Sequence, residues 1–189
     1  MEKSNLENFY KENIIDILSK ELKISNRMEV PKLNKIVLNM GLGDAKDNKN
    51  SLQQAVEELS SITGQKPVIR KSKKAISNFK IRQNDPVGVS VTLRKKKMYE
   101  FLERFIAIVS PRIRDFRGFS SKGFDGMGNY NFGINEQVVF PEINYDKVNA
   151  IRGLNLTFVT SAKDDSSAFK LLDSFGFPFR KTSSDNNQG

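Results

Sequence analysis

The sequence predicts an α+β fold: a mainly antiparallel β-sheet, helices packed on one side of it, and a basic loop that projects from a single domain. Two observations lead to this fold class. Apolar residues recur at helical spacing in some segments and alternate with polar residues in others. Several strand candidates are separated only by loops, without a strict alternation of strands and helices. Residues 1–181 are expected to form the domain and residues 182–189 a disordered tail.

The chain begins with a predicted helix, which is followed by a predicted strand. Residues 3–22 place apolar side chains three and four positions apart, with charged residues between them, so one helical face is apolar. Over residues 36–42 the period changes to two, and Ile36, Leu38 and Met40 point to one side. This second segment is therefore expected to be a strand with one apolar face.

A second helix and a second strand come next. Ser51 and Gln54 have the spacing of a capping box, and Gly64 is well placed to end the helix that they begin. Residues 87–94 alternate between apolar and small or polar side chains, so they are expected to form another half-buried strand.

The second half of the chain repeats both kinds of pattern. Four cations at 94–97 precede a helix with an apolar face over residues 98–109, and Pro111 is expected to stop that helix. Five glycines between 118 and 133 favour a long irregular loop or hairpin. Two strands and a last helix then follow, at residues 134–140, 154–160 and 168–175.

Composition restricts the chemistry open to this chain. It has 189 residues, a formal net charge of +9, and neither cysteine nor histidine. Disulfides, thiolate zinc sites and imidazole bases are therefore excluded. No carboxylate pair suits acid/base catalysis and no glycine motif fits a dinucleotide, so we expect no enzyme, cofactor, metal site or small-molecule substrate. No apolar run approaches the roughly 20 residues that span a bilayer, so a cytoplasmic protein without membrane partners is expected.

The most basic segment, from Lys66 to Arg82, reads KPVIRKSKKAISNFKIR and contains seven Lys or Arg and no acid. Cations gain nothing from one another, whereas each one that meets a phosphate releases counterions and gains affinity. A polyanionic partner is therefore favoured. The other interpretation of such a run is an ordinary solvated face.

Polar residues on the two strand candidates indicate what kind of polyanion this is. Asn39 and Thr92 lie on the faces opposite the apolar ones, and Gln65 lies at the turn that leads into the basic segment. Amide and hydroxyl groups on an open sheet can bind ribose hydroxyls and phosphates across the wide minor groove of RNA. Ordinary solvent-facing strand residues are the alternative interpretation.

Several long motifs resemble those of a known family, in the same order and at the same spacing. They are VPKLNKIVLNMGLGDA at 30–45, LSSITGQKPVIRKSKKAISNFKIR at 59–82, SPRIRDFRGF at 110–119, FDGMGNYNFGINEQVVFPEINYDKV at 124–148 and RGLNLTFVTSA at 152–162. Together they resemble the bacterial-type large-subunit ribosomal protein L5 family, over residues 3–181. One departure is Met127, where relatives commonly carry Arg.

The resemblance implies a structural role on the ribosome. Family members bind 5S ribosomal RNA (rRNA) in the central protuberance and help to attach it to the large subunit. They also contact 23S rRNA, the P-site transfer RNA (tRNA) and neighbouring large-subunit proteins, and they form a bridge to a small-subunit head protein. A free-standing RNA chaperone or regulatory RNA-binding protein is the alternative function.

The resemblance also implies which residues carry these contacts. The 5S rRNA surface corresponds to Asn39, Gln65 and Thr92. Phosphate partners beside it are placed by charge and face alone, at Lys32, Lys35, Arg70 and Arg94. The loop near tRNA corresponds to residues 71–82, with contacts expected at Lys71, Ser72, Lys73, Lys74, Ser77, Asn78, Phe79, Lys80 and Arg82.

Overall fold

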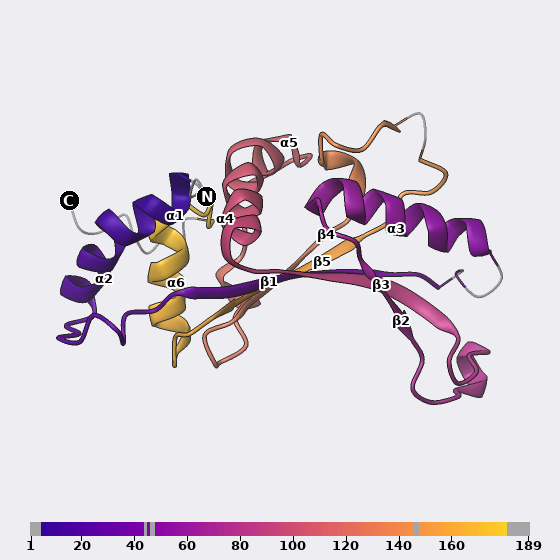
Figure 1. Ribbon diagram of the computed structural model, residues 1–189, viewed down its shortest axis with the longest axis horizontal. Coiled ribbons are helices and arrows are strands. Elements are labelled where there is room, and N and C mark those ends of the chain that lie inside the picture. The colour runs from indigo at the N-terminus through magenta and orange to yellow at the C-terminus, as the bar shows by residue number, and fades with distance from the viewer. Residues whose placement is uncertain (1–4, 44, 46–47, 146–147, 181–189) are drawn as a thin grey trace. The chain divides into compact units, whose positions relative to one another are not determined.

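The computed structural model describes residues 5–43, 45, 48–145 and 148–180 (Figure 1). Five strands form one sheet in the order β2-β3-β1-β5-β4, and β3 is antiparallel to both β1 and β2. This arrangement confirms the α+β fold class. Among the described residues, no helix is both long and apolar enough to cross a membrane. The expected tail at 182–189 lies outside the described residues.

The chain divides into two compact units. Unit 1 consists of Met1–Lys35, Arg94–Phe132 and Phe158–Gly189, and unit 2 consists of Ile36–Leu93 and Gly133–Thr157. The boundary between them falls within three strands: β1 (Leu33–Gly41), β4 (Tyr130–Ile134) and β5 (Leu154–Thr160). That residues 1–181 act as a single domain stays a prediction.

Each unit has its own helices, and strands β2 and β3 lie wholly within unit 2. Unit 1 contains α1 (Asn5–Phe9), the π-helix η1 (Tyr10–Ile14), α2 (Ile15–Glu21), α4 (Lys95–Arg104), the π-helix η3 (Phe105–Val109), α5 (Ser110–Arg112), the 3-10 helix η4 (Ser121–Gly123) and α6 (Asp165–Ser174). Unit 2 contains α3 (Lys49–Thr63), β2 (Val68–Lys71), the 3-10 helix η2 (Ser77–Phe79), β3 (Pro86–Leu93) and the 3-10 helix η5 (Gln137–Val139).

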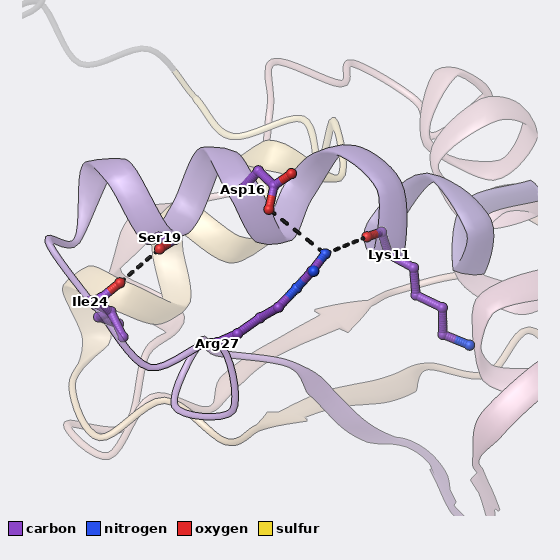
Figure 2. Close-up of polar contacts among 5 residues, drawn as sticks. All are labelled: Lys11, Asp16, Ser19, Ile24 and Arg27. Carbon is purple, nitrogen blue, oxygen red and sulfur yellow. Dashed lines mark hydrogen bonds and ion pairs between the residues drawn. The ribbon is translucent and has the colours of Figure 1, made fainter.

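The N-terminal helix of unit 1 forms where its apolar spacing predicts it, with a π-helical segment in the middle. Buried Tyr10 donates its hydroxyl hydrogen to the Pro31 carbonyl at 2.9 Å, which ties the helix to the start of β1. The connecting turn also folds back along α2 (Figure 2). There Arg27 reaches the Lys11 carbonyl at 3.4 Å and the Asp16 carboxylate at 3.7 Å.

Aromatic side chains fill the core of unit 1. The Phe105 ring is fully buried, and its centroid lies 5.5–6.4 Å from those of five other rings: Phe101, Phe119, Phe132, Phe158 and Phe177. These distances are typical of favourable aromatic pairs. The cluster brings together residues from two of the three stretches of sequence that make up this unit, Arg94–Phe132 and Phe158–Gly189.

The helix that begins at Lys95 continues through Pro111, so the prediction that Pro111 stops it was wrong. The π-helical segment η3 changes the hydrogen-bonding pattern just before the proline, and the Ser110 hydroxyl donates to the Phe105 carbonyl at 3.0 Å. Pro111 then lies in the first turn of α5, a position at which proline is favoured. The helix ends at Arg112 instead, and Ile113 after it is extended.

Helix α6 is stabilised at its N-terminus by Asp164. Its carboxylate accepts hydrogen bonds from the Ser167 backbone N–H at 2.9 Å and from the Ser167 hydroxyl. These bonds favour the charged form and lower the pKa of Asp164 below its ordinary value.

Replacing Asp164 with alanine is expected to lower the free energy of unfolding by about 1 kcal/mol at neutral pH, because the cap is lost. Asp164→Asn is the control, since an amide oxygen also caps. Because the folded-state pKa lies below the unfolded one, the stabilisation is present above the unfolded pKa and declines as pH falls through the folded pKa. Urea denaturation at neutral and acidic pH measures both effects, and equal stability of all three proteins at neutral pH would contradict the cap.

Helix α3 of unit 2 confirms the second predicted helix but not its predicted cap. Asn48 is the N-cap residue, and its side-chain oxygen accepts hydrogen bonds from the backbone N–H groups of Asn50 and Ser51. Ser51 lies inside the first turn and receives a hydrogen bond from Arg152. Gly64 ends the helix at φ 62°, as predicted, in a left-handed conformation that glycine adopts without strain.

The strand expected at 134–140 is not formed. Strand β4 ends at Ile134, and η5 follows. The reason is the fully buried Gln137, whose amide donates to the Ala150 carbonyl at 2.7 Å and accepts from the Arg152 backbone N–H. The Gln137 side chain thus pairs with the backbone of residues 150–152. Residues 137–139 form a turn of 3-10 helix and do not continue strand β4. The loop expected to continue to 133 is likewise shorter, because β4 begins at Tyr130.

Candidate nucleic-acid interface

The pairing of β1, β3 and β2 brings polar residues of unit 2 onto one face of the sheet. Asn39 lies opposite Ser90, and Ser90 lies opposite Val68 on the other neighbouring strand. Thr92 lies opposite Val37, which is the next pair along the strands on the same face. We call this surface, with Arg70 and Gln65 at its edge, the polar sheet face.

The opposite side of the same strands is closed. Ile36, Leu38 and Met40 of β1 are fully buried, as are Val89 and Leu93 of β3. Helix α3 packs against β3 on that side (Figure 1). In unit 2, the polar sheet face is therefore the side of these strands that is not covered by α3.

The three residues implied by the resemblance are brought together. The Gln65 side-chain amide donates to the Thr92 carbonyl at 3.2 Å, which fixes the turn before β2 against β3. Asn39 and Thr92 lie on neighbouring strands and are half-buried. Among the described residues, neither the Asn39 amide nor the Thr92 hydroxyl makes a hydrogen bond, so both retain their capacity to bind a ligand.

Arg70 joins this surface through Ser90. Its Nε donates to the Ser90 hydroxyl at 2.6 Å, while the residue itself stays exposed. Ser90 is almost fully buried beneath it. The contact holds the guanidinium beside the polar sheet face, where its remaining donors can meet a phosphate.

Close approach of β1 and β3 depends on Gly88. A Cβ atom at this position would lie 2.6 Å from the Met40 carbonyl oxygen, which is closer than real Cβ contacts come. Gly88 pairs with Gly41 on β1, where a Cβ would meet nothing within 4 Å. Only the β3 member of this pair therefore needs to be glycine for lack of space.

The remaining cations assigned to 5S rRNA lie in unit 1. Lys32 precedes β1 and is exposed, and its backbone N–H donates to the Ser161 hydroxyl at 3.0 Å. Lys35 lies within β1 and is half-buried. Arg94 is exposed at the N-cap position of α4. Their part in one surface with Asn39 stays a prediction.

The basic segment forms a β-strand and a structured loop. Strand β2, which the sequence does not reveal, pairs with β3 over Val68 to Lys71, with a register shift between Arg70 and Lys71. The loop from Lys71 to Arg82, which we call the arm, projects beyond the ends of β2 and β3 (Figure 1). At its base, the Ser72 backbone N–H donates to the Asp85 carbonyl at 2.8 Å.

Most side chains of the arm are exposed. The cations Lys71, Lys73, Lys74, Lys80 and Arg82 are exposed, as are Ser77, Asn78 and Phe79, whereas Ser72 is half-buried. Within the part of the chain that the structure describes, no salt bridge involves Lys71, Lys73, Lys74 or Arg82. These charges are therefore exposed to solvent and form no salt bridge with the described residues.

Met127 lies at the tip of a well-ordered turn in unit 1. The carboxylate of Asp125 accepts hydrogen bonds from the backbone N–H groups of Met127 and Asn129, and Asp165 accepts from Gly126 and Gly128. The Asn129 side-chain amide, which donates to the Asp125 carboxylate at 2.8 Å, contributes most to lowering the pKa of Asp125, and the two backbone hydrogen bonds to this carboxylate lower it further. The Met127 side chain is 75% exposed, so the backbone is fixed while this position presents an uncharged group to solvent.

Comparison with known proteins agrees with the sequence motifs. Residues 26–82 match the family described as Ribosomal protein L5, and residues 86–179 match the C-terminus of the same ribosomal family. The chain is 54% identical over 177 residues to the large ribosomal subunit protein uL5 of Cupriavidus metallidurans, covering 94% of this chain and 98% of that protein.

Two further relatives match over 177 and 180 residues. The large ribosomal subunit protein uL5 of Geobacter sulfurreducens is 55% identical, covering 94% of this chain and 99% of its own. The protein of the same name in Chlorobium phaeobacteroides is 54% identical, covering 95% of this chain and 92% of its own. Two family matches and identity above one half over nearly the whole chain lead to one conclusion: the chain belongs to the ribosomal protein L5 family.

Proposed function

We propose that this protein binds 5S rRNA through the polar sheet face and attaches it to the large ribosomal subunit in the central protuberance. The observation that carries the proposal is the strand register, which gathers Asn39, Thr92, Gln65 and Arg70 on the side of the sheet that α3 leaves open.

The wider role follows from family membership. The protein is a ribosomal protein of the large subunit, an RNA-binding structural component of the translation machinery and not an enzyme. A structural role needs shape recognition and firm attachment. It requires no reacting group.

The chemistry of the polar sheet face suits folded RNA. Asn39 offers both a donor and an acceptor, and Thr92 offers a hydroxyl that can do either. Such groups recognise ribose hydroxyls and phosphates across a wide, shallow minor groove. Arg70 adds a charged contact at the edge, which strengthens binding without reading sequence.

The arm is the second RNA contact in this proposal. Its exposed cations suit the phosphates of P-site tRNA. The proposal also includes 23S rRNA, neighbouring large-subunit proteins and a bridge to a small-subunit head protein as partners. Lys32, Lys35 and Arg94 are proposed as further phosphate contacts on the strength of their charge.

A double substitution tests the 5S rRNA contact. Asn39→Ala with Thr92→Val is expected to weaken 5S rRNA binding about 30-fold, because two hydrogen bonds of roughly 1 kcal/mol each are lost. Neither change removes a charge, so the salt dependence of binding should stay the same. Filter binding at several salt concentrations measures both. Gln53→Ala, which removes an exposed amide from α3 on the other side of the sheet, is the matched control.

Two results would count against the proposal. If the double variant binds 5S rRNA as tightly as the unmodified protein, the polar sheet face is not the contact surface. If unrelated duplex RNA displaces 5S rRNA at equal mass, the protein lacks the required recognition, and a free-standing RNA chaperone becomes the better assignment.

A further inference from the structure

The tip of the arm presents an aromatic ring to water. Phe79 is 72% exposed, and Ile76 beside it is 46% exposed. Most phenylalanines of this chain lie in the aromatic core of unit 1 or are at least half-buried. A large ring left in solvent at the end of a projecting loop is available to a partner, because it makes little contribution to the core.

The backbone under this ring is held in one conformation. Ile76 and Ile81 exchange two backbone hydrogen bonds, of 2.9 and 3.2 Å, and close a short loop around Ser77–Phe79. Lys80 follows in the left-handed conformation, with φ 53° and its N–H on the Ser77 carbonyl at 2.9 Å. Residues in this unfavourable region occur preferentially at binding sites.

A second set of hydrogen bonds fixes the base of the arm. The Asp85 carboxylate accepts from the Arg82 backbone N–H at 2.8 Å, and the Asn84 N–H donates to the Ser72 carbonyl at 3.0 Å. The Ser72 hydroxyl donates to the Lys74 carbonyl. The ring is thus presented on a preorganised loop, so less conformational entropy is lost when a partner binds.

The surroundings of Phe79 indicate the chemistry of that partner. The arm has five Lys or Arg and no acid between Lys71 and Arg82. An apolar protein surface would leave these charges desolvated without compensation. A ring among cations is instead the combination that binds nucleic acid by stacking on a base while the charges meet phosphates.

We infer that Phe79 stacks on an exposed base face of tRNA, either an unpaired base or the outer face of a terminal base pair. This inference deepens the proposed tRNA contact and rests on it. Lysine and arginine hold the RNA backbone, and Phe79 recognises a flat surface that an uninterrupted duplex does not expose along its length. The arm would then distinguish folded tRNA from duplex RNA by shape.

Binding of tRNA to the full-length protein tests the stacking contact. Phe79→Ala is expected to weaken binding of a deacylated elongator tRNA about 5- to 150-fold, with an unchanged salt slope. Phe79→Tyr keeps the ring and should bind within about twofold. Lys73→Ala with Lys74→Ala, the charge control, should flatten the slope by about 0.7 to 0.9 per lost phosphate contact.

The result for 5S rRNA separates this inference from the proposed function. Phe79→Ala should bind 5S rRNA normally, since the polar sheet face is intact. If Phe79→Ala binds tRNA like the unmodified protein while the lysine variant binds weakly, the arm uses charge alone and stacking is wrong. If neither variant loses affinity for tRNA, the proposed tRNA contact fails as well.

A fluorescent reporter gives a direct measurement of the same contact. The chain contains no tryptophan, so Phe79→Trp introduces a single indole. Stacking on a base should quench its emission when tRNA is added. Met28→Trp is the matched control, since Met28 is 86% exposed in unit 1 and should report no change. An unquenched indole at position 79 in saturating tRNA would overturn the inference.

Discussion

Replacing Phe105 with alanine is expected to lower the free energy of unfolding by about 3 to 5 kcal/mol, a larger loss than any surface substitution in this protein should cause. The ring is fully buried and lies among five others, so its removal eliminates apolar burial and leaves a cavity lined by rigid rings. Urea denaturation followed by circular dichroism measures the loss.

Phe9→Ala is the control for this result. Phe9 is 44% exposed on the N-terminal helix, so its truncation should cost much less than that of Phe105. A loss below about 1 kcal/mol for Phe105→Ala would mean that the cluster collapses to fill the space. The aromatic contacts would then not explain the stability of unit 1.

Replacing Gly88 with alanine is expected to destabilise unit 2 by about 1 to 3 kcal/mol and to weaken 5S rRNA binding at the same time. The added Cβ would lie only 2.6 Å from the Met40 carbonyl oxygen, so that oxygen must move. That oxygen belongs to the backbone of β1, so relief requires β1 and β3 to separate. Asn39 and Thr92 would then move apart as well.

The partner glycine provides the control for this change. Gly41→Ala adds the same atom at the paired position, where nothing lies within 4 Å, so stability and 5S rRNA affinity should change little. Denaturation and filter binding on both variants measure the two effects. If the two alanine variants behave alike, glycine is not needed at position 88 for close strand approach.

Regular elements could be predicted from the sequence where one face of the element is apolar. The alternation over residues 154–160 gives β5 with its observed bounds, and Gly64 ends α3 as expected. Strand β2 could not be found in this way, because all four of its residues are exposed and none shows a buried face. Strand β2 forms because it pairs with β3, and this pairing joins residues that are far apart in the sequence and leave no local pattern.

Errors arose where a side chain bonds to a distant backbone group. The apolar run at 138–140 resembles a strand. However, the side chain of the buried Gln137 forms hydrogen bonds with the backbone of Ala150 and Arg152. The same limit applies to the candidate interface. Alternation along the strands predicted that Asn39 and Thr92 lie on non-core faces, whereas the hydrogen bond between Arg70 and Ser90 could not be predicted because it depends on the pairing of β2 with β3.

The hairpin of β2 and β3 also sets a length. Both strands carry the polar sheet face; β2 leads into the arm and β3 follows it. The number of residues between each strand and the Ile76–Ile81 bridge therefore determines how far the tip stands from the face. One extra residue in each strand would lengthen this span by about 3.4 Å and turn every following side chain to the opposite side. Two extra residues in each would restore the orientation at about twice that extension. The length of the hairpin therefore sets the distance of the tip from the polar sheet face, and only an even number of added residues in each strand keeps the side chains of the arm on the same side.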